Sequence, residues 1–211
     1  MQITKFGHSC ILIEEASVRI LTDPGVYSVL PGDLINIDLI LITHGHTDHL
    51  DVSVLKNILT HNKTAQILTN RSVGEMLSKE GVPFELLEDG QKTKIRGVEI
   101  IGIGDNHASI HRDWPISQNT AYLIANNIFI PGDSFTEPKI PIEILALPIS
   151  SPWNSLGESI DYAIKVKPKF CIPIHDGNMV NVLGSHKTVA TIIEKHGISF
   201  VELEIGKATV V

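Results

Sequence analysis

The sequence concentrates side chains that bind metal ions in one stretch, Thr43–His49, which reads Thr-His-Gly-His-Thr-Asp-His. Three imidazoles and one carboxylate stand within six consecutive positions, a density and order typical of a metal site. The stretch follows the apolar run 38–42, which we expect to be a buried strand. Residues in the turn at a strand end can converge on one point. We therefore predict a metal site here, in preference to a surface turn that happens to be rich in histidine.

Three more histidine or acidic residues stand shortly after other apolar runs that we expect to be strands: His107, Asp133 and His175. Taken alone, each is more typical of an ordinary turn. Together with the 43–49 stretch they complete the ligands that two metal ions need, provided that these strands end at one edge. The predicted ligands are His44, His46, Asp48, His49, His107, Asp133 and His175.

These ligand types point to hydrolysis by divalent metal ions. Three imidazoles leave an open position on a tetrahedral zinc ion, as in catalytic sites. A carboxylate can bridge to a second ion, and two ions about 3.5–4 Å apart can lower the pKa of a shared water from about 16 to near 7. The resulting hydroxide would attack a carbonyl or phosphoryl centre, whose developing charge the ions stabilise. Zinc suits this site best, and manganese, iron or nickel are compatible with it.

Length and composition predict one folded domain over residues 1–211. Of the 211 residues, 43% are apolar, which is enough for a substantial core. The net charge of −7 makes nucleic acid an unlikely partner, because general binding to its backbone needs a basic face. The two cysteines, Cys10 and Cys171, form no disulfide framework, and we expect both to be buried and reduced. Neither a signal peptide at Met1–Thr4 nor a membrane-spanning run is visible, so we expect a cytoplasmic protein.

Short β-rich runs alternate with a few helical patterns along the chain. Asp51 is the predicted N-cap of the first helix, and Ser72 and Ser155, each with Glu three positions later, predict capping boxes. This order of elements predicts two sheets packed on each other with helices outside both. The predicted strands are 3–6, 10–14, 18–22, 38–42, 65–69, 84–87, 92–95, 98–103, 121–125, 128–131, 143–147, 170–174, 199–204 and 208–211, and the predicted helices are 51–59, 72–79, 155–165 and 185–196.

Over essentially its whole length, the chain resembles the metallo-β-lactamase fold superfamily, and within it the small cytoplasmic hydrolases similar to ascorbate-6-phosphate lactonase. The motifs that carry the resemblance are Phe6–Cys10, Thr22–Pro24, Thr43–His49, His107–Ser109, Pro131–Ser134 and Ile172–His175. The resemblance implies an α/β (α+β) fold, a four-layer αββα sandwich of two mixed sheets flanked by helices. It also implies that the metal ions lie at the edge between the two sheets.

The resemblance further implies how the ligands are divided. Asp48 and Asp133 would be catalytic carboxylates as well as ligands. His46 stands where flavodiiron relatives typically have glutamate, which favours hydrolysis over redox chemistry. One ion would be held by His44, His46 and His107 and the other by Asp48, His49 and His175, with Asp133 bridging the two.

Several residues are candidates for supporting roles. Asp23 is expected to hold the second ring nitrogen of a ligand histidine, although an ordinary Asp-Pro turn is the alternative. The family pattern places His8 near the metals without giving it a role. His111, Arg112 and Trp153 are candidates for binding the substrate, Arg112 through a phosphate or carboxylate group. A solvated loop arginine is an equally good interpretation of Arg112.

The remaining features are ambiguous. Residues 24–37 and 108–119 are loops with apolar side chains, and the sequence does not tell whether they cover the site. We expect His61, His186 and His196 to lie on the surface of helices or at helix ends.

The predicted function is therefore a binuclear metal-dependent hydrolase that acts on a small, anionic ester, lactone or phosphodiester, without a membrane partner. A nuclease or nucleotide phosphodiesterase would use the same metals but lacks an aromatic and basic stripe here. A non-catalytic module that binds a metal or ligand is a further alternative. The sequence identifies neither the substrate nor the oligomeric state, and a homo-oligomer is one of the alternatives.

Overall fold

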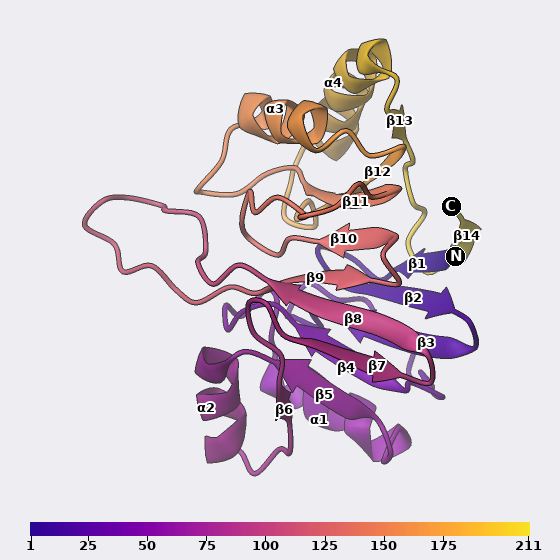
Figure 1. Ribbon diagram of the computed structural model, residues 1–211, viewed down its shortest axis with the longest axis vertical. Coiled ribbons are helices and arrows are strands. Elements are labelled where there is room, and N and C mark those ends of the chain that lie inside the picture. The colour runs from indigo at the N-terminus through magenta and orange to yellow at the C-terminus, as the bar shows by residue number, and fades with distance from the viewer.

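Two seven-stranded β-sheets pack face to face in the computed structural model, which describes residues 1–211 (Figure 1). The first sheet has the strand order β14-β1-β2-β3-β4-β5-β6 and the second β13-β12-β11-β10-β9-β8-β7. Each sheet combines antiparallel and parallel pairs, so both are mixed sheets, as the sequence predicted.

The first sheet consists of β1 (Gln2–Lys5), β2 (Ile11–Glu15), β3 (Val18–Thr22), β4 (Leu39–Ile42), β5 (Gln66–Thr69), β6 (Glu85–Leu86) and β14 (Thr209–Val210). The second consists of β7 (Lys92–Ile95), β8 (Val98–Ile103), β9 (Ala121–Ile124), β10 (Ile128–Ile130), β11 (Ile144–Pro148), β12 (Phe170–Ile174) and β13 (Ser199–Phe200). The helices are α1 (Val52–His61), α2 (Arg71–Lys79), α3 (Leu156–Val166) and α4 (Val182–Ile193), and a short 3₁₀ turn, Glu194–His196, follows α4.

Strand alternation explains the four layers. In β4, Leu39 and Leu41 pack into the core between the two sheets, whereas Ile40 and Ile42 pack into a second core beneath α1 and α2. Both faces of the strand are buried, which is why every position of this run is apolar. A third core lies between the second sheet and helices α3 and α4. The predicted αββα arrangement is confirmed (Figure 1).

Strand direction decides where the polar turns gather. In the first sheet β1, β3 and β4 run the same way, because β2 is antiparallel to both β1 and β3 while β4 is parallel to β3. In the second sheet β8, β10, β11 and β12 share one direction. The segments that follow these strands carry His8, Asp23, the 44–49 stretch and the later candidates. The carboxyl ends of these strands therefore place the candidate functional residues at one edge of the sandwich.

Two helix starts differ from the predictions. Helix α2 is capped by Asn70, whose side chain accepts from the N–H of Val73, so Ser72 is not its cap. Helix α4 begins three residues before the predicted Ser185 and is capped by Asn181. Asparagine caps a helix as well as serine does, so both residues were available as caps. The caps predicted at Asp51 and Ser155 are confirmed, the latter with a complete capping box.

The segment between β8 and β9 contains no helix or strand over residues 104–120 and projects from the body as a long loop (Figure 1). The closing strands are shorter than expected, since 199–204 forms a strand only at Ser199–Phe200. Cys10 and Cys171 are buried and unpaired, as predicted. None of the helices combines the length and apolar character that crossing a membrane requires.

Candidate metal centre

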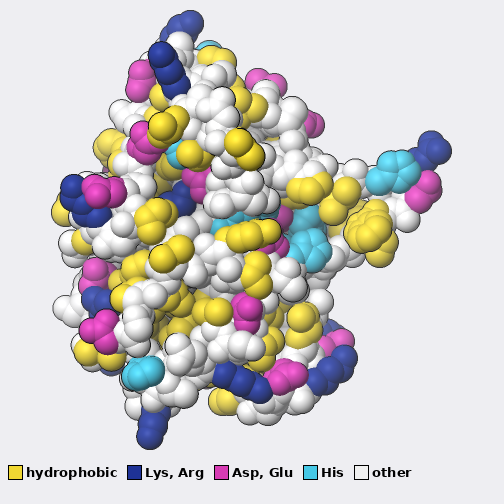
Figure 2. All heavy atoms as spheres, turned by 180° about the vertical axis from the view of Figure 1, so that it is seen from behind, with side chains coloured by type: hydrophobic (Ala, Val, Ile, Leu, Met, Phe, Trp, Pro, Cys, Tyr) yellow, Lys and Arg dark blue, Asp and Glu magenta, His cyan; other side chains and the backbone are white.

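Two groups of histidine and aspartate side chains face each other at the shared strand edge. Within each group the candidate ligand atoms all lie within 4.8 Å of one another. Histidine and acidic side chains are visible together on this face, at the base of the projecting loop (Figure 2). The first group is His44, His46, His107 and Asp133, and the second is His8, Asp48, His49 and His175.

The Asp133 carboxylate lies between the two groups. Its Oδ1 is 3.0 Å from His49 Nε2, while its Oδ2 is 3.0 Å from His175 Nε2 and 3.4 Å from His107 Nε2. The turn before it requires Gly132, which has a φ of +62° and a position where a Cβ would lie 2.3 Å from Asn119 Oδ1. That Asn119 oxygen accepts the N–H of Asp133, so the turn holds the carboxylate between the two sheets.

The donor set fits a divalent cation. His44 Nε2 and His107 Nε2 are buried and make no hydrogen bond, since Asp133 Oδ2 lies 3.9 Å from the first and 3.4 Å from the second. Leaving buried polar atoms unpaired destabilises a fold by about 1–3 kcal/mol each, and such atoms call for an explanation. Here they converge around one carboxylate, and imidazole nitrogens with carboxylate oxygens are the ligands that zinc and related ions prefer.

The outer ring nitrogens of three histidines donate to fixed acceptors. His107 Nδ1 donates to the Ala108 carbonyl at 2.6 Å, and His175 Nδ1 donates to the Ser150 carbonyl. His49 Nδ1 donates to Asp23 Oδ2 at 2.8 Å. Because the hydrogen occupies Nδ1, the Nε2 lone pair of a neutral ring points at the centre of the site.

Asp23 connects the strand β3 to the first ligands. Its Oδ1 accepts the Thr43 N–H and its Oδ2 accepts the Thr43 hydroxyl, both at 2.8 Å. The Thr43 oxygen lies 3.1 Å from His44 Nδ1 and, having given its hydrogen to Asp23, accepts the imidazole N–H. One buried carboxylate thereby orients two imidazoles of the 44–49 stretch.

Three residues of the site adopt left-handed backbone conformations, His8 at φ 37°, Asp23 at φ 43° and His175 at φ 57°. Such conformations cost non-glycine residues of order 1–3 kcal/mol each. They persist where surrounding contacts enforce them, and they cluster at functional sites. Seven other non-glycine residues with positive φ lie elsewhere in the chain, so these three are informative because they coincide with the candidate site.

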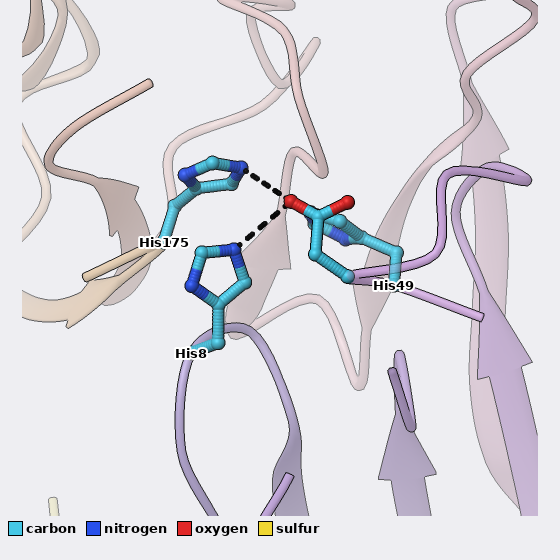
Figure 3. Close-up of side chains that lie close together, drawn as sticks. His8, His49 and His175 are labelled. Carbon is cyan, nitrogen blue, oxygen red and sulfur yellow. Dashed lines mark hydrogen bonds and ion pairs between the residues drawn. The ribbon is translucent and has the colours of Figure 1, made fainter. Parts of the chain in front are cut away.

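In His8 the ring nitrogen that faces the site, Nε2, carries the hydrogen, unlike in the three histidines that donate from Nδ1. Figure 3 shows its contact with a carboxylate. The Gly177 N–H donates to His8 Nδ1 at 3.1 Å, so Nδ1 carries no hydrogen. Burial lowers the pKa of His8, and the neutral ring must then carry its hydrogen on Nε2, which lies 3.2 Å from Asp48 Oδ2. His8 and His175 approach the same carboxylate oxygen from two sides. His8 thus donates to Asp48 and has no free lone pair facing the centre.

Protonation differs between the two groups. In the first, burial and neighbouring imidazoles lower the pKa of His44 and of His46, so these rings are neutral. In the second, burial also opposes protonation, but nearby carboxylates outweigh it. They raise the pKa of His49 well above its usual value and the pKa of His175 to about 9. Without a metal, neutral pH therefore favours imidazolium forms of His49 and His175 paired with carboxylates, whereas His8 stays neutral.

Of the three predicted substrate residues, the structure brings Trp153 to the metal centre but not His111 or Arg112. His111 and Arg112 lie on the projecting loop, with side chains 62% and 87% exposed. The loop is closed at its base, where the His107 N–H donates to the Ser117 carbonyl, and the residues between extend outward. Trp153 is buried, and its indole N–H donates to Asp133 Oδ2 at 2.8 Å. Trp153 therefore holds a candidate ligand, a role that the sequence did not suggest.

A buried ion-pair network adjoins the turn after β12, which carries His175 of the second group. Lys5 Nζ is 2.6 Å from Asp176 Oδ1, and His186 bridges Asp176 at 2.9 Å and Glu202 at 2.7 Å. Contrary to the expectation of a surface position, His186 is buried. The network fixes the turn after β12, the turn that supplies both His175 and the Gly177 N–H. Its members are distant in sequence, so no local pattern marked them.

Comparisons with known proteins agree with this geometry. A family model described as "Beta-lactamase superfamily domain" matches residues 2–175. The chain is 33% identical to the protein Rv0786c of Mycobacterium tuberculosis, with 83% of this chain and 84% of that protein covered. It is 28% identical to the UPF0173 metal-dependent hydrolase PF1764 of Pyrococcus furiosus, at 83% and 84% coverage.

Among solved structures, the chain is similar to Igni18, a metallo hydrolase from the archaeon Ignicoccus hospitalis. The TM-score is 0.75 at 19% identity, covering 99% of this chain and 97% of that chain. At this level of identity, the likeness shows a common fold.

Metal binding to the second group is expected to depend strongly on pH. A metal must displace the hydrogen from the Nε2 atoms of His49 and His175. Since their pKa values are raised, that of His175 to about 9, affinity for Zn²⁺ should rise with pH from 6 to 8. The expected slope is about tenfold per pH unit for each displaced proton. Calorimetry in two buffers of different ionisation enthalpy measures the number of protons released on metal binding. Binding without proton release would contradict the assignment of His49 and His175 as ligands.

His186 should stabilise the fold most at low pH. Burial alone would lower its pKa, but the carboxylates of Asp176 and Glu202 raise it. A raised folded-state pKa gives a contribution that is complete below pH of about 6.5 and is lost as pH rises through the folded value. We expect His186→Gln to reduce the free energy of unfolding by about 1–2 kcal/mol more at pH 6 than at pH 9.5. Urea denaturation measures this; the exposed His196→Gln is the control, and a pH-independent loss would count against the network.

Proposed function

Because the chain belongs to the beta-lactamase superfamily, we propose that it is a hydrolase that uses two divalent metal ions at the edge between its sheets. The observation that carries the proposal is the convergence of two ligand groups on the Asp133 carboxylate, whose oxygens lie 3.0–3.9 Å from buried nitrogens of His44, His49, His107 and His175. A relative named a metal-dependent hydrolase supports the same reaction class.

The hydrogen bonds support a particular division of ligands. His8 is excluded, because the hydrogen on its Nε2 points toward Asp48. The remaining side chains match the division that the resemblance implied. One ion would be held by His44, His46 and His107 and the other by Asp48, His49 and His175, with Asp133 between them. Zinc suits these ligands best, and manganese, iron or nickel are compatible with them.

When bound, the two ions supply Lewis acidity that lowers the pKa of a water molecule and offsets the negative charge developing on the attacked group. The side chains supply orientation. Asp48 is 22% exposed whereas Asp133 is 4% exposed, so Asp48 is the carboxylate that an incoming water meets. Hydrogen bonds from His175 and His8 outweigh burial and hold the pKa of Asp48 far below its usual value. Asp48 is therefore ionised and can accept a hydrogen bond from the attacking water.

Two neutral N–H groups keep the carboxylates in place. His8 Nε2 fixes Asp48 Oδ2 from one side of the site, and Trp153 Nε1 fixes Asp133 Oδ2 from the other. Both donors are buried, which strengthens their hydrogen bonds and keeps the geometry before a substrate arrives. The bond attacked would be that of a small ester, lactone or phosphodiester, because this arrangement serves a carbonyl and a phosphoryl centre alike.

Loss of one ligand tests the function directly. His46→Ala is expected to remove one metal ion per chain and to lower kcat/KM at least about 100-fold on a panel of p-nitrophenyl esters, lactones and bis(p-nitrophenyl) phosphate. His61→Ala, an exposed histidine on α1, is the control and should change neither value. Metal content by mass spectrometry and initial rates are the readouts. Unchanged hydrolysis in His46→Ala, or no turnover of the whole panel by wild type with two bound metals, would contradict the proposal.

His8 is expected to act through Asp48 rather than through a metal. His8→Asn should retain two metal ions per chain and lower kcat by about 10-fold or more with little change in KM, because Asp48 loses its buried donor. His175→Asn should instead lose metal. Comparing metal content, kcat and KM for the two variants separates the roles. Loss of one metal ion from His8→Asn would make His8 a ligand.

A further inference from the structure

A cavity of about 360 Å³ lies beside the second ligand group. Four separate parts of the chain form it: the residues after β1, the loop 24–37, the turn from β12 into α4, and the segment after β13. Its apolar lining consists of Tyr27, Val29, Met179, Val182, Leu203 and Ile205. A larger cavity of about 610 Å³ is lined by polar side chains and contains none of the candidate ligands.

The charged groups in the smaller cavity neutralise one another. Lys5 pairs with Asp176, and His186 pairs with both Asp176 and Glu202. Lys5 Nζ also donates to the Pro173 carbonyl at 2.8 Å. No cation is left over for an anionic group, and the carboxylates already have partners. The chemistry of this cavity therefore favours an uncharged occupant.

The imidazole ring of His8 belongs to both the cavity wall and the second group. His8 lines the cavity, and its ring centroid lies 4.1 Å from that of His175 and 5.3 Å from that of Tyr27. Its Nε2 is the atom that donates to Asp48 (Figure 3). Tyr27, which also lines the cavity, is 45% exposed and its ring contacts that of His8, so the cavity wall and the second group share a contact. The sequence did not tell whether the loop 24–37 covers the site. In the structure this loop supplies Tyr27 and Val29 to the cavity wall.

We propose that the cavity binds an uncharged acyl or aryl group of the substrate while the scissile bond lies at the metal centre, an inference that rests on the proposed hydrolase function. At roughly 30 Å³ for a water-sized group, the cavity accommodates up to about a dozen heavy atoms. The preferred substrate is then an ester or lactone with a medium-length apolar arm. This departs from the anionic substrate that the sequence suggested.

The first test uses chain length. For p-nitrophenyl esters from acetate to octanoate, kcat/KM of the wild type should rise up to about fourfold per methylene until the cavity is full. Val182→Trp fills the cavity and should abolish this rise with chain length. Leu183→Trp is the matched control, because Leu183 is the next residue, is 69% exposed and does not line the cavity. Val182→Ala enlarges the cavity and should move the optimum to a longer chain. A Val182→Trp series that parallels the wild type would overturn the proposal.

The second test measures binding without hydrolysis. 1-Aminonaphthalene, an uncharged apolar fluorophore small enough for the cavity, should bind metal-free and metal-loaded wild type and be displaced by 1-octanol but not by octanoate. Val182→Trp should weaken probe binding at least tenfold and Leu183→Trp should not. Absence of probe binding by the wild type would overturn the cavity's role. Probe binding with no ester, lactone or phosphodiester of the panel hydrolysed would instead overturn the proposed function, so the two failures are distinguishable.

Discussion

The shared direction of the strands that lead into the site is the constraint on which the rest depends. Because β1, β3 and β4 end where β8, β10, β11 and β12 end, turns from both sheets face one another across a single edge. The Asp133 carboxylate then contacts imidazoles that arrive from either sheet. Three left-handed residues at these turns show that the fold tolerates backbone strain to keep this convergence.

Electrostatic compensation explains how so many ionisable groups can be buried together. In the absence of metal, carboxylates raise the pKa values of His49 and His175, while burial lowers those of His44 and His46. A similar compensation occurs behind the site, where Lys5, Asp176 and His186 neutralise one another. That network leaves the adjoining cavity without free charge, which is why its apolar walls decide what it binds. The same buried turn thus supports a ligand and shapes the specificity pocket.

Local patterns in the sequence predicted much of this arrangement. The apolar run of β4 and the dense motif after it are contiguous, so both the strand and the ligand cluster could be identified from residue types alone. Contacts between residues that meet only in the folded chain could not be identified from the sequence. Trp153 donates to Asp133, and His186 pairs with Glu202, but neither contact leaves a periodic or spaced pattern. The direction of the loop that carries Arg112 is likewise set by its anchored base, which its own sequence does not reveal.

The central claim is that two ions lie on either side of Asp133. Anomalous scattering from crystals loaded with zinc, recorded above and below the absorption edge, locates such ions without any assumption about activity. Our account predicts two peaks, one within coordinating distance of His44, His46 and His107 and one within coordinating distance of Asp48, His49 and His175. A single peak, or a second peak coordinated by His8 Nε2, would contradict it.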